Sequence, residues 1–123
     1  MTGSDLLDAT TLRNLVELDD GSYGLLKEMI AIFREDTPHR IQDILAAARQ
    51  RDAEALSRAA HALKGGAGAL GAKALRTLAA DLEATARDGS ADAGEELSVH
   101  LQAAFQAALL ALETYVQEGE SRA

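Results

Sequence analysis

The hydrophobic positions of this chain recur at alternating intervals of three and four residues over most of its length. This spacing places apolar side chains on one face of an α-helix. Together with the glycines and capping residues that interrupt it, the pattern predicts five helices, over residues 9–19, 23–50, 53–68, 72–88 and 93–117. The short connections predict an all-α fold, an antiparallel up-and-down four-helix bundle with a short extra N-terminal helix. We expect one domain over residues 1–123, with residues 118–123 frayed.

The longest predicted helix, residues 23–50, contains the only proline of the chain, Pro38. Its apolar stripe passes through this proline without a change of phase and comprises Leu26, Ile30, Phe33, Thr37, Ile41, Ile44 and Ala48. A proline inside a helix removes one backbone hydrogen bond and usually kinks the chain. The sequence therefore predicts a single helix kinked at Pro38, and the alternative is two helices separated near Asp36.

Composition restricts the classes of function open to the chain. The formal net charge of −8 argues against nucleic acid as a partner, because binding to phosphates requires a basic surface. There is no cysteine, which excludes thiolate metal sites, and neither His39 nor His100 has a second metal ligand at helical spacing. The N-terminus lacks a secretion signal, and no apolar stretch is long enough to span a bilayer. We therefore expect a cytoplasmic protein that binds no metal and no membrane.

The third predicted helix carries one histidine, His61, followed by a cluster of glycines. On a helical wheel, the core direction is defined by Leu56, Ala60, Leu63 and Ala67. His61 points about 140° away from this direction and is expected to face solvent. Lys64 and Gly65 lie one turn further along the same face, and Gly68 lies one turn beyond them. Glycine inside a helix lowers stability by roughly 0.5–1 kcal/mol relative to alanine. We therefore expect these glycines to have a role other than stabilising the helix.

These residue types in this order favour a phosphoryl carrier. A neutral imidazole is a competent nucleophile near neutral pH, and Lys64 can offset the charge of a phosphoryl group on His61. Gly65 and Gly68 are expected to leave room for the active site of a partner protein. The chain has no glycine-rich nucleotide-binding loop, so we expect it to carry a phosphoryl group without an ATP site of its own and without being an enzyme.

Two further glycines are expected to serve the fold. Gly66 turns toward the core side of the wheel, and Gly71 lies near the turn that follows the helix. Both are therefore predicted to permit close approach of neighbouring helices.

The segment AHALKGGAGALGA, residues 60–72, resembles the histidine-containing phosphotransfer (HPt) domain of bacterial phosphorelays. The family pattern has a histidine, a hydrophobic residue two positions on, Lys-Gly at three and four, and a glycine at ten. In this chain these are His61, Leu63, Lys64, Gly65 and Gly71. The likeness extends upstream through residues 33–38 and downstream through residues 82–89. It implies a four-helix bundle in which His61 is phosphorylated and Lys64 is its electrostatic partner.

The resemblance also implies the partners. Family members accept a phosphoryl group from the aspartate of one receiver domain and donate it to another, so response-regulator receiver domains, a hybrid histidine kinase, or both are expected. The receiver supplies the aspartate and Mg²⁺, and the chain is expected to need no cofactor of its own. A single exposed histidine can work in a monomer.

One feature departs from the common phosphorelay pattern. Many members carry serine or alanine after Lys-Gly, whereas this chain has Gly66-Ala67-Gly68. That variant resembles the phosphoacceptor domain of chemotaxis kinases, in which a kinase domain phosphorylates the histidine from ATP. Two alternatives therefore remain open, phosphorylation in trans by a histidine kinase, and an unphosphorylated module that docks on a receiver or kinase.

Overall fold

The computed structural model describes residues 3–122, and six helices account for most of this range. The helices are α1 (Gly3–Leu6), α2 (Ala9–Leu18), α3 (Gly24–Arg49), α4 (Ala53–Ala69), α5 (Lys73–Arg87) and α6 (Gly94–Arg122). Over residues 3–122 no strand is present, which confirms the all-α prediction.

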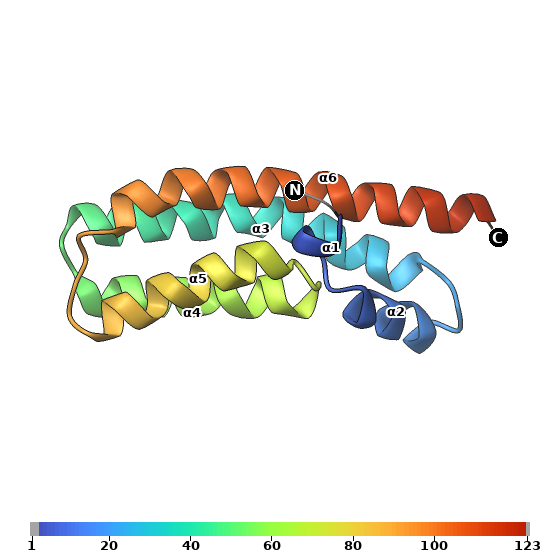
Figure 1. The fold of residues 1–123 in the computed structure, drawn as a ribbon, viewed down its shortest axis with the longest axis horizontal. Helices are drawn as coiled ribbons and strands as arrows, with labels where there is room; N and C mark the ends of the chain where they lie inside the picture. The colour runs from blue at the N-terminus through green and yellow to red at the C-terminus, as the bar shows by residue number, and fades with distance from the viewer. Residues whose placement is uncertain (1–2, 123) are drawn as a thin grey trace.

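Helices α3 and α6 lie side by side along the length of the molecule, and the shorter helices cover them (Figure 1). The α4–α5 hairpin packs along one half of this pair and completes an antiparallel four-helix bundle. Helix α2 lies beside the other half, and α1 lies near the middle (Figure 1). The predicted bundle with an additional N-terminal helix is therefore confirmed, although the single turn of α1 was not foreseen.

The core of the bundle is built mainly from the apolar stripes of its four long helices, and α2 contributes Leu12. The fully buried large side chains are Leu12, Leu26, Ile41, Ile44, Leu56, Leu63, Leu75, Leu82, Leu101 and Leu112. Phe33 and Phe105 meet edge to face across the α3–α6 interface, with their ring centroids 5.2 Å apart. Such a pair adds about 0.5–1.5 kcal/mol beyond the burial of its area.

The structure corrects two expectations about the long helices. Helix α3 continues through Pro38 without interruption, so the alternative of two helices separated near Asp36 is wrong. Helix α6 extends to Arg122, so the expected fraying of residues 118–122 is also wrong. A tyrosine on the N-terminal side of α3, Tyr23, packs against Gly119, and Lys27 forms an ion pair with Glu120 at 3.2 Å. These contacts hold the last turn of α6 against α3.

Among residues 3–122, no helix has both the length and the apolar composition that crossing a bilayer requires.

Candidate functional site

Helix α4 presents His61 to solvent. Asp52 caps the helix, since its side chain accepts a hydrogen bond from the backbone N–H of Ala55 at 3.0 Å. The predicted core stripe of α4 is buried throughout. As the helical wheel predicted, the side chain of His61 lies on the opposite side and is 65% exposed. The imidazole is therefore open to a second protein.

The turn at Gly71 brings α5 back alongside α4. Gly71 has φ +67°, a left-handed conformation that favours glycine, and its N–H donates to the carbonyl of Gly68 at 3.1 Å. A Cβ atom at Gly71 would lie 3.0 Å from the backbone oxygen of Asp8. The prediction that Gly71 permits close packing at the turn is confirmed. Because the two helices are antiparallel, residues on the middle of α5 lie opposite the middle of α4.

This arrangement places a buried carboxylate, Glu83 of α5, in contact with the imidazole of His61. One carboxylate oxygen, Oε2, lies 2.8 Å from Nδ1 of His61, and the other, Oε1, lies 2.6 Å from Nζ of Lys64. The guanidinium of Arg87 lies 3.2 Å from Oε2 and donates to it. The side chain of Glu83 is only 4% exposed. Three donors thus surround one buried acceptor, which is how a buried charge is tolerated.

These donors keep Glu83 ionised. The hydrogen bond from Lys64 is the main reason that the pKa of Glu83 lies below its usual value of 4.5. Burial acts in the opposite direction, while the hydrogen bond with His61 and the charges of Lys64 and Arg87 act with the main effect. An ionised carboxylate can only accept hydrogen bonds. The Nδ1 atom of His61 must therefore carry the proton.

The protonation of Nδ1 decides which ring nitrogen can react. In a neutral imidazole, one nitrogen carries the proton and the other has a free lone pair. With Nδ1–H donated to Glu83, the lone pair is on Nε2, at the other side of an exposed ring. The geometry therefore makes Nε2 the candidate nucleophile.

Lys64 does not lie free beside the imidazole. Its side chain is partly buried, at 30% exposure, and its ammonium is bound to the same carboxylate that holds His61. The lysine and histidine are thus joined through Glu83, a connection that the sequence analysis did not predict.

The three glycines after Lys64 have different surroundings. A Cβ atom on Gly65 would meet nothing within 4 Å, so nothing among the described residues requires glycine there. Gly68 is covered by Arg76 of α5, whose Cδ would lie 3.2 Å from an added Cβ, so its backbone is less open than expected. Gly66 is exposed, and an added Cβ would meet only Nε of Arg40, at 4.0 Å. The prediction that Gly66 allows close helix packing is therefore wrong.

Glu83 is the residue of the candidate site that the sequence did not predict. Its position carried a detectable signal, because it lies four residues after the buried Ala79 and three before the buried Ala86. A charged residue at a core position of a helix is rarely found without a partner. The partner, however, comes from another helix.

A groove lies between α3 and α4, beside Gly66. It encloses about 180 Å³ and is mainly apolar, with walls formed by Met29, Ile32, Phe33, Asp36, Thr37, Arg40, Gly66, Ala69 and Leu70. Ile32 on its rim is 59% exposed, unusually open for a large apolar side chain. The groove is lined on the α4 side by Gly66 and Ala69, in the glycine-rich segment that follows His61.

Comparisons with known proteins identify the family of the chain. A family model described as the Hpt domain matches residues 28–119. The structure is similar to that of histidine-containing phosphotransfer protein B (HptB) from Pseudomonas aeruginosa PAO1, with a TM-score of 0.79 and 28% identity, covering 91% of this chain and 95% of that chain. It also has the fold of the histidine-containing phosphotransfer protein ZmHP2 from maize, with a TM-score of 0.80 and 21% identity, covering 99% of this chain and 90% of that chain. A search of curated proteins gives no significant match.

Since the family model spans most of its length, the chain belongs to the histidine-containing phosphotransfer (HPt) domain family. Its function is histidine phosphotransfer in a two-component phosphorelay. Members of this family carry phosphoryl groups and interact with receiver domains and histidine kinases.

Proposed function

We propose that Nε2 of His61 accepts a phosphoryl group from the phosphoaspartate of one receiver domain and donates it to the aspartate of another. The observation that carries this proposal is the hydrogen bond between Nδ1 of His61 and the buried, ionised Glu83. It leaves the lone pair on Nε2 of a side chain that is 65% exposed and so accessible to a partner.

In the accepting step, the Nε2 lone pair attacks phosphorus and forms an N–P bond. The P–O bond to the receiver aspartate breaks, and the aspartate leaves as a carboxylate. The Nδ1 proton stays in place, so the phosphorylated ring becomes cationic, and the negative charge of Glu83 stabilises it. Donation to the second receiver is the reverse of these bond changes.

Lys64 supports the phosphoryl group by its charge. Its ammonium lies one helical turn from His61, and part of its side chain is exposed. We expect Mg²⁺ and the remaining catalytic groups to come from the receiver, so the chain works as a carrier without a cofactor or an ATP site of its own.

The partner docks, we propose, over the exposed face of α4 and the adjoining α3–α4 groove. The bare backbone of Gly65 allows close approach, and Ile32 with Met29 supplies apolar contact area. Gly68 contributes less open backbone because Arg76 lies over it. One such face serves one partner at a time, and a monomer is sufficient.

The test is transfer from a phosphorylated receiver. Purified receiver domains from the same genome, charged with acetyl phosphate, should label the protein with phosphate that is labile in acid and stable in base. His61→Gln should abolish labelling, while His100→Gln, a change at an exposed histidine of α6, should not. Persistent labelling of His61→Gln would contradict the proposal.

The glycine-rich sequence Gly66-Ala67-Gly68 favours a second candidate, phosphorylation of His61 in trans by a histidine kinase. Incubation with ATP and a kinase that lacks its receiver domain separates the two. Rapid labelling under these conditions, without labelling by any phosphorylated receiver, would favour the kinase as the donor. Absence of acid-labile phosphate from every reaction would favour a docking module.

A further inference from the structure

Most cations of α3 and its neighbours are neutralised by carboxylates. The exposed pairs are Lys27–Glu120, Arg34–Glu113, Arg49–Glu95, Arg51–Asp92 and Arg58–Glu54. Within residues 3–122, Arg40 of α3 and Arg76 of α5 form no ion pair. Arg13 and Arg122 also form no ion pair within these residues, but Arg40 and Arg76 are the two that lie beside the glycine segment following His61.

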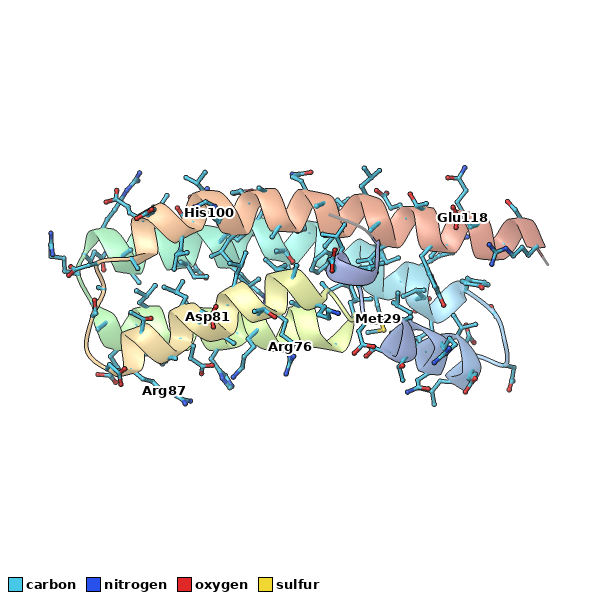
Figure 2. All side chains as sticks on the ribbon, viewed as in Figure 1. Met29, Arg76, Asp81, Arg87, His100 and Glu118 are labelled. Atoms are coloured by element: carbon cyan, nitrogen blue, oxygen red, sulfur yellow. The ribbon has the colours of Figure 1, made fainter. Side chains whose placement is uncertain are left out.

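These two arginines lie on opposite sides of the same glycine segment of α4. Nε of Arg40 would lie 4.0 Å from a Cβ on Gly66, and Cδ of Arg76 would lie 3.2 Å from a Cβ on Gly68. A Cβ atom on Gly68 would press on the aliphatic part of Arg76, whereas one on Gly66 would only reach ordinary contact with Arg40. Figure 2 shows Arg76 pointing away from the bundle along the same edge of α5 as Arg87.

The arginines are close enough to His61 to meet the same partner. Gly66 and Gly68 follow His61 by five and seven residues, which is about 8–10 Å along the helix axis at 1.5 Å per residue. A standard protein–protein interface covers about 800 Å² on each partner, so a globular protein that places its active site on His61 can also reach the arginines beside Gly66 and Gly68. At this separation they contact the rim of that active site and not the phosphoryl group itself.

We propose that Arg40 and Arg76 bind carboxylates at the rim of the receiver's active site and so determine which receivers the protein recognises. This inference rests on the proposed transfer between receivers. A site that holds Mg²⁺ presents several carboxylates, so unpaired arginines are complementary to its surroundings. Charge complementarity of this kind mainly raises the rate of association and excludes partners of the wrong charge.

The experiment compares three charge-reversal variants that all have the same net charge. Arg40→Glu and Arg76→Glu are compared with Arg122→Glu, which makes the same charge change at an exposed position at the far end of α6 (Figure 1). The donor is the phosphorylated receiver domain, from the same genome, that labels the unmodified protein fastest. We expect kcat/KM for transfer to fall at least about fivefold for each of the first two variants, and to stay unchanged for the third. Raising the salt concentration to about 0.5 M should reduce the difference.

A small donor separates docking from chemistry. Phosphoramidate transfers its phosphoryl group to an imidazole nitrogen with ammonia as the leaving group, and needs no protein surface. Both arginine variants should be labelled by it at the rate of the unmodified protein. Equal receiver-dependent rates for all three variants, or slower phosphoramidate labelling of the arginine variants, would overturn the inference. If no receiver labels the unmodified protein, the proposed function itself fails.

Discussion

Glu83 Oε2 lies 2.8 Å from Nδ1 of His61, so a buried carboxylate of α5 fixes the orientation and the protonation of an exposed imidazole on α4. The two residues are 22 positions apart in the sequence, and the α4–α5 hairpin brings them together. One member of the pair is inaccessible to solvent and the other is open to it. The fold therefore separates the group that positions the nucleophile from the group that meets the partner.

Replacing Glu83 by Gln tests this relationship. The amide keeps the shape of the carboxylate, but it is neutral and can turn its NH₂ group toward the ring. The Nε2–H tautomer then becomes favourable, and the lone pair moves to Nδ1. We expect transfer from a receiver to slow about 10- to 100-fold, the loss typical when the carboxylate that orients a metal-bound histidine is removed.

The tautomer can be observed directly by ¹⁵N NMR of the imidazole. In the unmodified protein at neutral pH the neutral ring should be protonated at Nδ1, and in Glu83→Gln a substantial Nε2–H population should appear. Glu54→Gln, at an exposed glutamate of the same hairpin, is the matched control and should leave both the rate and the tautomer unchanged. A purely structural role for Glu83 would leave the tautomer of the folded variant as it was.

Lys64→Ala is predicted to slow phosphoryl transfer while the fold stays intact. The change removes a cation one helical turn from His61, and it also removes the strongest donor to Glu83, so the pKa of Glu83 should rise. Lys64→Arg should recover part of the rate because it keeps the charge. Rates are measured by quenched-flow transfer from a labelled receiver, and circular dichroism checks the helix content. An unchanged rate in Lys64→Ala would remove the role assigned to this residue.

Gly65 offers a way to separate stability from function. An added Cβ at this position meets nothing within 4 Å. Gly65→Ala should therefore raise the free energy of unfolding by roughly 0.5–1 kcal/mol, the usual gain for alanine inside a helix. Gly65→Gln should be at least as stable as the unmodified protein, but its longer side chain should obstruct the partner and slow transfer several-fold.

The measurements for Gly65 are urea unfolding, receiver-dependent transfer and labelling by phosphoramidate. Labelling by the small donor should be the same in all three proteins, because no docking is involved. A Gly65→Gln variant that is as fast as the unmodified protein with its receiver would show that the open backbone at Gly65 serves no partner.

The orientation of His61 could be predicted from the sequence because it depends only on the geometry of one helix. The buried stripe of α4 sets the core direction, and the angle to His61 follows from 100° per residue. Contacts between helices could not be predicted in the same way. The pairing of Glu83 with His61 and Lys64 depends on how α5 aligns against α4, and that alignment is set by the turn at Gly71.

Two wrong predictions have the same cause. The helical wheel placed Gly66 toward the core side, but α3 and α4 leave a groove at this level, and Arg40 extends over the glycine instead. The C-terminal residues were expected to fray because their apolar stripe ends, yet Tyr23 and Lys27 from the start of α3 hold them. In both places contacts between helices determine the structure, and the spacing of apolar residues within one helix does not predict such contacts.

The ionised state of Glu83 also predicts how stability depends on pH. Its pKa in the folded protein lies below the usual 4.5, whereas in the unfolded chain it returns to about that value. Ionised Glu83 therefore adds stability above its unfolded pKa, and this contribution is lost as the pH falls through the lower, folded pKa. Urea unfolding from about pH 6 to about pH 3 should show a decline in stability for the unmodified protein that is smaller in Glu83→Gln. Glu54→Gln, at a carboxylate exposed to solvent, should follow the unmodified protein. If Glu83→Gln declined as steeply, Glu83 would titrate equally in the folded and unfolded chains, and the three donors around it would not be holding its charge.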